Sequence, residues 1–551
     1  MTRTNPAIVS QAGVRPLARW ALLLVCAAYL LPGQFGRDAW RHADLIAFGF
    51  MSNLAQGHEA WLQPQLGGVA TPDGALLPYW LGALFIKALP FLEPALAARL
   101  PFIGILALVM ALVWYACFHL ARTDAAQPLS FAFGGEADTV AYARTLSDGA
   151  VLALIASLGL ASLGHETTPE LVQLFAASLW LYALACAPFR KGKAQWGAAV
   201  ALVILALSGA AQFALVLGIG GLLVCQFSSF AGARQLRIGL AVGLALVLLL
   251  AQTLNLWQWR VVSPDPGSLV RLLAWFTWPT AAMAAWTLWR WRAYLTNRHV
   301  STPLTLALLS LGSCIAMGGH ERALLLALPA LAVLASFALP TMNRSLSAMV
   351  DWFSVFAFSL LAVFVWLYYL AIQTAWLPRL SANVLRLSPG FSAPFDPFAL
   401  LLGIAGTVAW VLLVRWRTSR QRSALWRSLV LPAGGTVVIW LLLMTLWLPP
   451  INHIFSHQGL LGTFKTVLPE QSTECIAAPN QNLSLVATLE AQGGWRVRAD
   501  LPLSKTPCNW AVRVVSAKQI DEPIPDGWAL KATVIRQPER NRRYQVLLRI
   551  P

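Results

Sequence analysis

Acidic residues, with two histidines among them, gather in three short stretches of this sequence. The stretches are "RDAWRHAD" with Asp38 and Asp44, "TPDG" with Asp73, and "GHETTPEL" with His165, Glu166 and Glu170. A carboxylate can act as a general base that deprotonates a hydroxyl or an amine. Several carboxylates can instead hold a divalent metal ion, with histidine as a further ligand. We therefore expect acid–base chemistry here, or a metal site formed by His165, Glu166 and Asp73.

The composition places these residues in a membrane protein. Of the 551 residues, 58% are hydrophobic and only 11% are charged, whereas a soluble domain averages about 25% charged residues. In a soluble protein, a formal net charge of +17 would suggest binding to nucleic acid. Here short basic clusters alternate with apolar runs, as the positive-inside rule expects of cytoplasmic loops. The sequence predicts a polytopic membrane protein that binds membrane lipids and no nucleic acid.

Apolar segments of about 17–25 residues can cross a bilayer, and about thirteen are present. They cover residues 18–34, 97–120, 147–163, 168–188, 195–211, 213–230, 237–254, 269–289, 302–318, 322–340, 350–373, 396–414 and 428–448. With a cytoplasmic N-terminus, the basic clusters at 190–193, 290–298 and 415–427 all fall inside. An odd number of spans then puts the C-terminus outside, in the periplasm if the membrane is a bacterial inner membrane.

The predicted transmembrane domain of residues 1–450 contains one long external loop and is followed by a polar tail. The first external loop, residues 34–94, contains an apolar helix at 76–92 and an amphipathic helix that starts near Trp40, both expected at the membrane interface. Residues 451–551 form a polar tail with alternating strand patterns at 482–489, 494–501, 510–517 and 544–550. We predict a small α/β domain there, whose external position permits a disulfide between Cys475 and Cys508.

Positive side chains on the same predicted side suit a lipid phosphate, because they neutralise its charge as a metal ion would. The candidates are Arg37, Arg41, Lys87, Arg322, Arg379 and Arg386. For each charged cluster alone, a structural role is the simpler interpretation: Pro169 followed by Glu170, for example, is typical of a helix start. The chain has no Walker loop and no dinucleotide-binding glycine pattern, so we expect no nucleotide cofactor and a substrate that is activated elsewhere.

The first external loop resembles that of bacterial GT-C-type glycosyltransferases that use polyprenyl-phosphate donors. These include the lipid A aminoarabinose transferases and the protein O-mannosyltransferases. Their loop runs as an acidic "DE", a helix with an acid, "GDWxxPxxxG" and "DKPPLYYW". The matching positions here are Asp38, Asp44, Gly57, Trp61, Pro64, Gly67, Tyr79 and Trp80. The family's "ARLP" follows at Ala98–Pro101, Glu170 replaces the aspartate of its "TTD" turn, and "HERALLLALPAL" from His320 is similar to its late span.

The resemblance implies a multi-span GT-C fold and an inverting transfer of a sugar from a polyprenyl phosphate to a lipid or protein acceptor, as in lipid A modification. It implies Asp38 and Glu170 as catalytic residues. Together with the positive side chains named above, it leads us to expect Arg37, Arg41, Asp44, Asp73, Tyr79, Lys87 and Arg322 at the substrates. This sequence departs from the family at Ala39, where the second acid stands, and at Gly74, where the lysine of "DKPP" stands.

Two other functions remain open. A transporter or flippase would use ionisable residues near the middle of the membrane, whereas the acids here gather near one face. A non-catalytic envelope protein that keeps the fold would explain Gly74.

Overall fold

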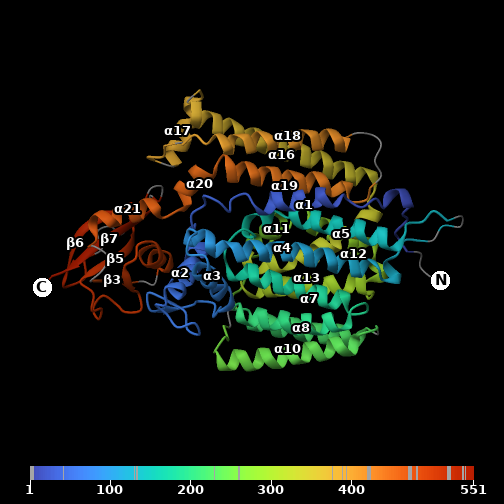
Figure 1. Cartoon of the computed structure of the whole chain (residues 1–551), viewed down its shortest axis with the longest axis horizontal. Coiled ribbons are helices and arrows are strands. Elements are labelled where there is room, and N and C mark those ends of the chain that lie inside the picture. The colour runs from blue at the N-terminus through green and yellow to red at the C-terminus, as the bar shows by residue number, and fades with distance from the viewer. Residues whose placement is uncertain are drawn as a thin grey trace.

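The structure is a computed structural model. It describes residues 5–550 except 41, 130, 132–133, 229, 259–260, 375, 388, 393, 419–423, 470–473, 480–481, 518–522, 537–538 and 540. Figure 1 shows a bundle of helices that run side by side, with the C-terminal domain, α2 and α3 at one end and the N-terminus at the other. We call these ends of the bundle the domain end and the far end.

Each of the thirteen predicted spans falls on helix. Ten correspond to one main helix: α1 Arg19–Leu30, α4 Pro94–Ala121, α7 Pro169–Cys186, α8 Lys191–Leu207, α9 Ala211–Phe227, α10 Ala233–Thr253, α13 Arg298–Ala316, α16 Arg344–Thr374, α18 Pro397–Thr418 and α19 Arg427–Thr445. Within the described residues, eight helices are long and apolar enough to cross a membrane, and α1 and α9 are shorter apolar helices. The multi-span membrane fold is therefore confirmed, while the number thirteen remains a prediction.

The other three predicted spans are interrupted helices. They are α5 Thr139–Ala156 with α6 Leu158–Leu163, α11 Pro266–Phe276 with α12 Thr280–Arg290, and α14 Glu321–Leu324 with η4 Leu325–Ala327 and α15 Leu328–Ser336. Pro279 precedes α12, where a proline, which has no N–H, cannot continue the hydrogen-bonding of a helix. In the bundle, α4 packs against α5 and α7, while α19 joins α16 and α18 to α5. The outer helices turn Phe356, Leu360 and Leu401 outward, as lipid-facing helices do.

Charges inside the bundle are paired with polar groups. The carboxylate of Asp148 in α5 accepts hydrogen bonds from the Leu17 backbone N–H and the Trp114 indole, both at 2.9 Å. Asp351 in α16 forms an ion pair with Arg417 in α18. These contacts fasten the N-terminal segment and the α16–α18 pair, because a buried charge is costly unless it is paired.

The first external loop forms α2 Ala43–Gln56, a small hairpin of β1 Gln65–Leu66 and β2 Val69–Ala70, and α3 Leu77–Ala88. Gly57 ends α2 in a left-handed conformation with φ +76°, which glycine adopts without strain. Positions 44, 45 and 47–54 of α2 are all buried, and its location at the membrane interface stays a prediction. The helix lies between α3 and α22 Leu483–Ala487 of the C-terminal domain, so its polar residues meet protein instead of headgroups.

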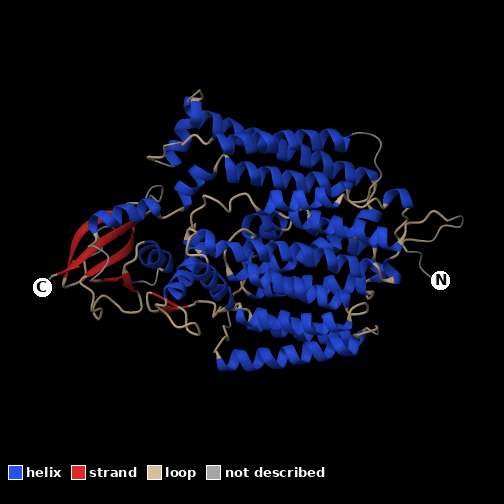
Figure 2. Cartoon of the chain, viewed as in Figure 1, coloured by secondary structure: helices blue, strands red, loops and turns tan. Residues whose placement is uncertain are grey.

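The C-terminal domain follows α20 Leu448–Phe455 and α21 Gln458–Val467 and contains a five-stranded sheet in the order β4-β3-β5-β7-β6 (Figure 2). Its strands are β3 Cys475–Ala477, β4 Arg496–Arg498, β5 Trp510–Ser516, β6 Trp528–Val534 and β7 Arg542–Arg549. The first three are parallel and the pairs β5–β7 and β6–β7 are antiparallel. The strand predicted at 482–489 is wrong, since Asn482 instead caps the helix α22 by accepting the Leu485 N–H.

Glu490 joins this domain to the first external loop. Its carboxylate accepts hydrogen bonds from the Asn53 side chain at 2.9 Å and the Gly67 backbone N–H at 3.0 Å. A third comes from the Val497 N–H of the domain itself at 3.2 Å. The loop and the domain are thus held together by one side chain as well as by apolar packing.

The predicted disulfide between Cys475 and Cys508 is confirmed. It links β3 to the segment before β5 across 33 positions, and closing such a loop contributes about 2–4 kcal/mol. We expect Cys475→Ser with Cys508→Ser to lower the unfolding temperature of the domain, measured by protease resistance on heating. The matched control is Cys225→Ser, which changes a buried free thiol in α9. Equal protease resistance of wild type and the double variant would contradict this prediction.

Candidate active site

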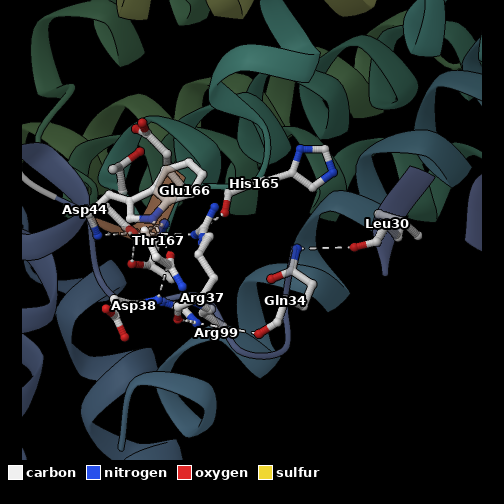
Figure 3. Close-up of polar contacts among 12 residues, drawn as sticks. Leu30, Gln34, Arg37, Asp38, Asp44, Arg99, His165, Glu166 and Thr167 are labelled. Atoms are coloured by element: carbon white, nitrogen blue, oxygen red, sulfur yellow. Dashed lines mark hydrogen bonds and ion pairs between the residues drawn. The ribbon is translucent and has the colours of Figure 1, made fainter. Parts of the chain in front are cut away.

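Asp44 is the centre of a buried polar cluster at the domain end of the bundle (Figure 3). One carboxylate oxygen accepts hydrogen bonds from Thr167, from its N–H at 2.9 Å and its hydroxyl at 2.6 Å. The other accepts the Trp40 N–H at 3.3 Å and lies 3.4 Å from the Arg37 guanidinium. Arg37 also donates to the His165 carbonyl at 2.8 Å. The first external loop is therefore tied to the turn between α6 and α7.

The charge of Asp44 is stabilised inside the protein. Burial by itself raises the pKa of this carboxyl, but Arg37, Arg99 and the two hydrogen bonds from Thr167 outweigh burial and lower it below its ordinary value. The side chains of Arg37 and Asp44 are only 1% and 3% exposed. The contacts above engage both Asp44 oxygens, while Nε of Arg37 is buried without a hydrogen-bond partner among the described residues. That these two residues bind substrate directly stays a prediction. They hold the loop in place.

Arg99 completes this cluster from within α4. Its guanidinium donates to the Arg37 carbonyl and, at 3.5 Å, to the Gln34 carbonyl. In the sequence Arg99 stands out only as part of "ARLP", which predicts no function for it. A signal was present, since an ionisable residue in a membrane span is rare and has a partner or a function. Here its partners are the carbonyls that precede Asp38.

Asp38 differs from Asp44 in that its carboxylate is not used by the fold. The residue is half-buried, and its backbone N–H donates to the Asn452 side chain at 3.4 Å. Asn452 also accepts the Trp40 indole at 2.9 Å and donates to the Gly36 carbonyl at 2.7 Å. With the described residues the Asp38 carboxylate makes no hydrogen bond or ion pair, as Figure 3 shows for those drawn. The backbone is fixed while the carboxylate is available.

Glu166 and Glu170 share one arginine. Arg322, in α14, lies 2.6 Å from Glu166 and 3.4 Å from Glu170, and it also reaches the Thr168 hydroxyl at 3.4 Å. The three charged side chains are 21–23% exposed, so small groups can reach them. Burial raises the pKa of Glu166 to about 7, although Arg322 opposes the shift. Glu170 also lies in the first turn of α7, after Pro169, so the predicted helix start is confirmed alongside the ion pair.

Asp73 and Tyr79 lie beside these glutamates. Asp73 accepts the Ala75 N–H at 3.1 Å, and its carboxylate is 3.5 Å from the Tyr79 hydroxyl. Burial, then the charges of Asp73 and Glu170, raise the pKa of Tyr79 well above its ordinary value. Tyr79 is buried and its hydroxyl orients Asp73. We expected Tyr79 to be open to substrate, and in this structure it is not. Gly74 has φ +67°, a conformation that a lysine would adopt only with strain.

Lys87 is not placed with the cluster, and Arg379 and Arg386 lie in α17 Pro378–Leu387. Lys87 is exposed near the C-terminal end of α3, about 12 Å along the helix from Tyr79. Its ammonium lies 5.7 Å from the centre of the Trp61 ring. Arg41 lies outside the described residues.

The predicted metal triad is not assembled. The His165 ring stacks on Trp440 at 4.1 Å, and its Nε2 lies 2.8 Å from the Tyr29 carbonyl, to which it must donate. Burial lowers the pKa of His165 to about 3, so the ring is neutral. Asp73 is engaged with α3, and the described residues contain no group of three His, Cys, Asp or Glu placed to share an ion. The described residues therefore do not fit a metal ion here.

The architecture defines the class. A multi-span helical bundle, helices in the first external loop and a small C-terminal α/β domain together form a fold of the GT-C type. Two solved structures match it over 96% of both chains: ArnT from Cupriavidus metallidurans bound to undecaprenyl phosphate, with TM-score 0.60, and the same ArnT in the apo state, with TM-score 0.61. Each is 15% identical in sequence to this chain, so the likeness confirms the fold. No protein-family model and no curated protein matches the chain.

Proposed function

We propose that this protein is an integral membrane glycosyltransferase that takes a sugar from a polyprenyl-phosphate donor and passes it to a lipid or protein acceptor. The observation that carries the proposal is the Asp38 carboxylate. It stands unengaged next to a rigid buried cluster, at the end of the bundle where the acidic stretches meet. The fold supports the donor class, because its structural neighbour binds undecaprenyl phosphate.

In the proposed reaction, an acceptor hydroxyl or amine attacks the anomeric carbon of the donor sugar. The new bond forms as the bond between this carbon and the phosphate oxygen breaks, and the configuration inverts. Asp38 accepts the proton of the acceptor, and the polyprenyl phosphate leaves as the anion. Asp38 suits this step because its carboxylate has no competing donor in the described structure and its backbone is held by Asn452.

We assign the leaving phosphate to Arg322. Its contact with Glu166 is short, at 2.6 Å, whereas that with Glu170 is 3.4 Å. A phosphate oxygen can replace the longer contact while Glu166 keeps the guanidinium in place. Positive charge at a developing anion is a large contribution to transition-state stabilisation. Glu166 then positions Arg322, and Glu170, freed from its contact with the guanidinium, completes the site.

For the location, we propose a bacterial inner membrane, with the domain end in the periplasm and the far end in the cytoplasm. Single cysteines introduced as Gly192→Cys and Ala60→Cys test it. Position 192 has open space around an added side chain, and Ala60 is exposed in the first external loop. We expect an impermeant maleimide added to whole cells to label position 60 and to reach position 192 only after lysis. Labelling of position 192 in intact cells would show that the protein has the opposite orientation in the membrane.

The function itself is tested by turnover. Membranes from cells that lack the native protein are supplied with the full chain and a polyprenyl-phosphate-linked sugar, and the glycosylated product is quantified by mass spectrometry. We expect product from wild type and little from Asp38→Asn. If wild type gave none with any such donor, transport or a non-catalytic role would replace the proposal.

A further inference from the structure

A second polar site lies at the far end of the bundle, away from the acidic cluster. It is a cavity of about 550 Å³ between the C-terminal ends of α4 and α7 and the start of α8. Arg99 lies near the start of α4 and His119 near its end, so about 30 Å of helix separates the two sites. The lining residues are Tyr115, Phe118, His119, Arg122, Tyr182, Phe189, Arg190 and Lys193.

The charge of this cavity is positive and uncompensated. Arg122, Arg190 and Lys193 converge on it, and none of its described lining residues is acidic. In the described structure none of the three forms an ion pair. His119 is 5% exposed. Its Nδ1 and the Nε of Arg122 are both buried and have no hydrogen-bond partner in the described structure. Three clustered cations beside buried polar atoms that lack partners favour an anionic ligand.

The aromatic rings give the cavity a defined shape. The Arg122 guanidinium lies 4.7 Å from the centre of the Phe189 ring and 5.3 Å from that of Phe118. Stacking of this kind fixes the plane of the guanidinium and leaves its N–H edge free for a phosphate. The His119 ring stacks on Phe189 at 5.3 Å. The first turn of α8 adds the positive end of a helix 17 residues long.

An apolar strip leads from this cavity along the surface of α4. Its exposed residues recur at helical spacing and are Gly104, Ala107, Leu108, Ala111 and Tyr115. Leu108 and Tyr115 are each 51% exposed, and Tyr115 also lines the cavity. A smooth apolar strip that ends at a cluster of cations fits a molecule with a hydrocarbon chain and a phosphate head, and a free phosphate would leave the strip unused.

We propose that this cavity binds the phosphate headgroup of an anionic membrane phospholipid, with an acyl chain along the exposed face of α4. Arg122 and Arg190 hold the phosphate, Lys193 adds long-range attraction, and Tyr115 and Phe189 flank the glycerol region. The lipid comes from the leaflet opposite the proposed glycosyl-transfer site. This assignment does not depend on the proposed function.

The test is native mass spectrometry of the delipidated full chain in detergent, titrated with phosphatidylglycerol. We expect Arg122→Gln with Arg190→Gln to weaken binding at least about tenfold, since charge-assisted contacts to phosphate are lost. The matched control is Arg234→Gln with Arg237→Gln, which removes two exposed cations at the start of α10 and should leave binding unchanged. Arg122→Lys with Arg190→Lys should restore much of the affinity.

Equal loss of lipid in the two glutamine variants would overturn the proposal, as would no loss in the cavity variant. If inorganic phosphate displaced the lipid from wild type at equal concentration, the cavity would be a site for the free anion and the lipid assignment would be wrong. Should the double variant unfold, Arg190→Gln alone gives the same comparison, because Arg190 is exposed.

Discussion

We expect Asp38→Asn to lower the rate of sugar transfer by a factor of about 10²–10⁴ and to leave the unfolding temperature almost unchanged. The rate falls because the amide cannot accept the proton of the acceptor. The fold is insensitive because no described residue is bonded to the Asp38 carboxylate, and the backbone contact with Asn452 remains. Transfer is measured with a polyprenyl-phosphate-linked sugar, and unfolding with purified protein in detergent.

Glu59→Gln is the matched control for this result. Glu59 is a partly exposed carboxylate in the same external loop, and it has no ion pair in the described structure. Its loss should change the transfer rate less than twofold. Wild-type turnover by Asp38→Asn would show that another group removes the proton. A large fall in unfolding temperature would show that Asp38 serves the fold.

Asp44→Asn produces the opposite pattern, a large loss of stability. Removing one partner of a buried ion pair typically costs about 3–5 kcal/mol, since the other charge stays buried without compensation. Here Arg37 and Arg99 would both lose the negative charge that faces them. We expect a marked fall in unfolding temperature in detergent, with the remaining transfer in proportion to the folded fraction.

The pH dependence follows from the direction of the shift. The pKa of Asp44 is lowered in the folded protein from the ordinary value of 3.8. Its charge therefore stabilises the fold fully above about pH 4, and this contribution is lost as the pH falls through the lower folded pKa. The difference in stability between wild type and Asp44→Asn should be constant near pH 7 and shrink in acid.

Asp500→Asn is the control for stability. Asp500 pairs with Arg498 at 2.8 Å on the surface, where the two side chains are 28% and 46% exposed, and such pairs contribute about 0–1 kcal/mol. If Asp44→Asn were no more harmful than Asp500→Asn, the buried cluster would not hold the loop.

The spans could be predicted from sequence because the bilayer imposes a length and an apolar composition on each helix. The packing of α2 between α3 and α22 could not be predicted from the sequence. Its pattern, with Asp44 and Asn53 among apolar residues, suits a headgroup interface as well as a protein interface. Only the contacts to Thr167 and Glu490 distinguish the two, and these partners are far away in the sequence.

The site shows the same division. The sequence brought together the correct acidic stretches, because residue type and the predicted side of the membrane indicate them. It could not rank them, since Asp38 and Asp44 look alike in "RDAWRHAD". The structure separates them by burial: Asp44 has four hydrogen-bond or ion-pair contacts, while the Asp38 carboxylate has none in the described chain. His165 was predicted as a metal ligand because it lies among carboxylates in the sequence. The sequence does not reveal that its ring packs against Trp440.

The Glu490 bridge has a bearing on biosynthesis. Glu490 and Asn53 are 437 positions apart, and Asn452, which holds Asp38, is also made after the last span. At about 5–20 residues per second, the first external loop waits roughly 20–90 s for these partners after its own synthesis. During that time both contacts are missing. A chain that ended after α19 would lack Glu490 and Asn452, and the backbone of Asp38 would lose the hydrogen bond that holds it.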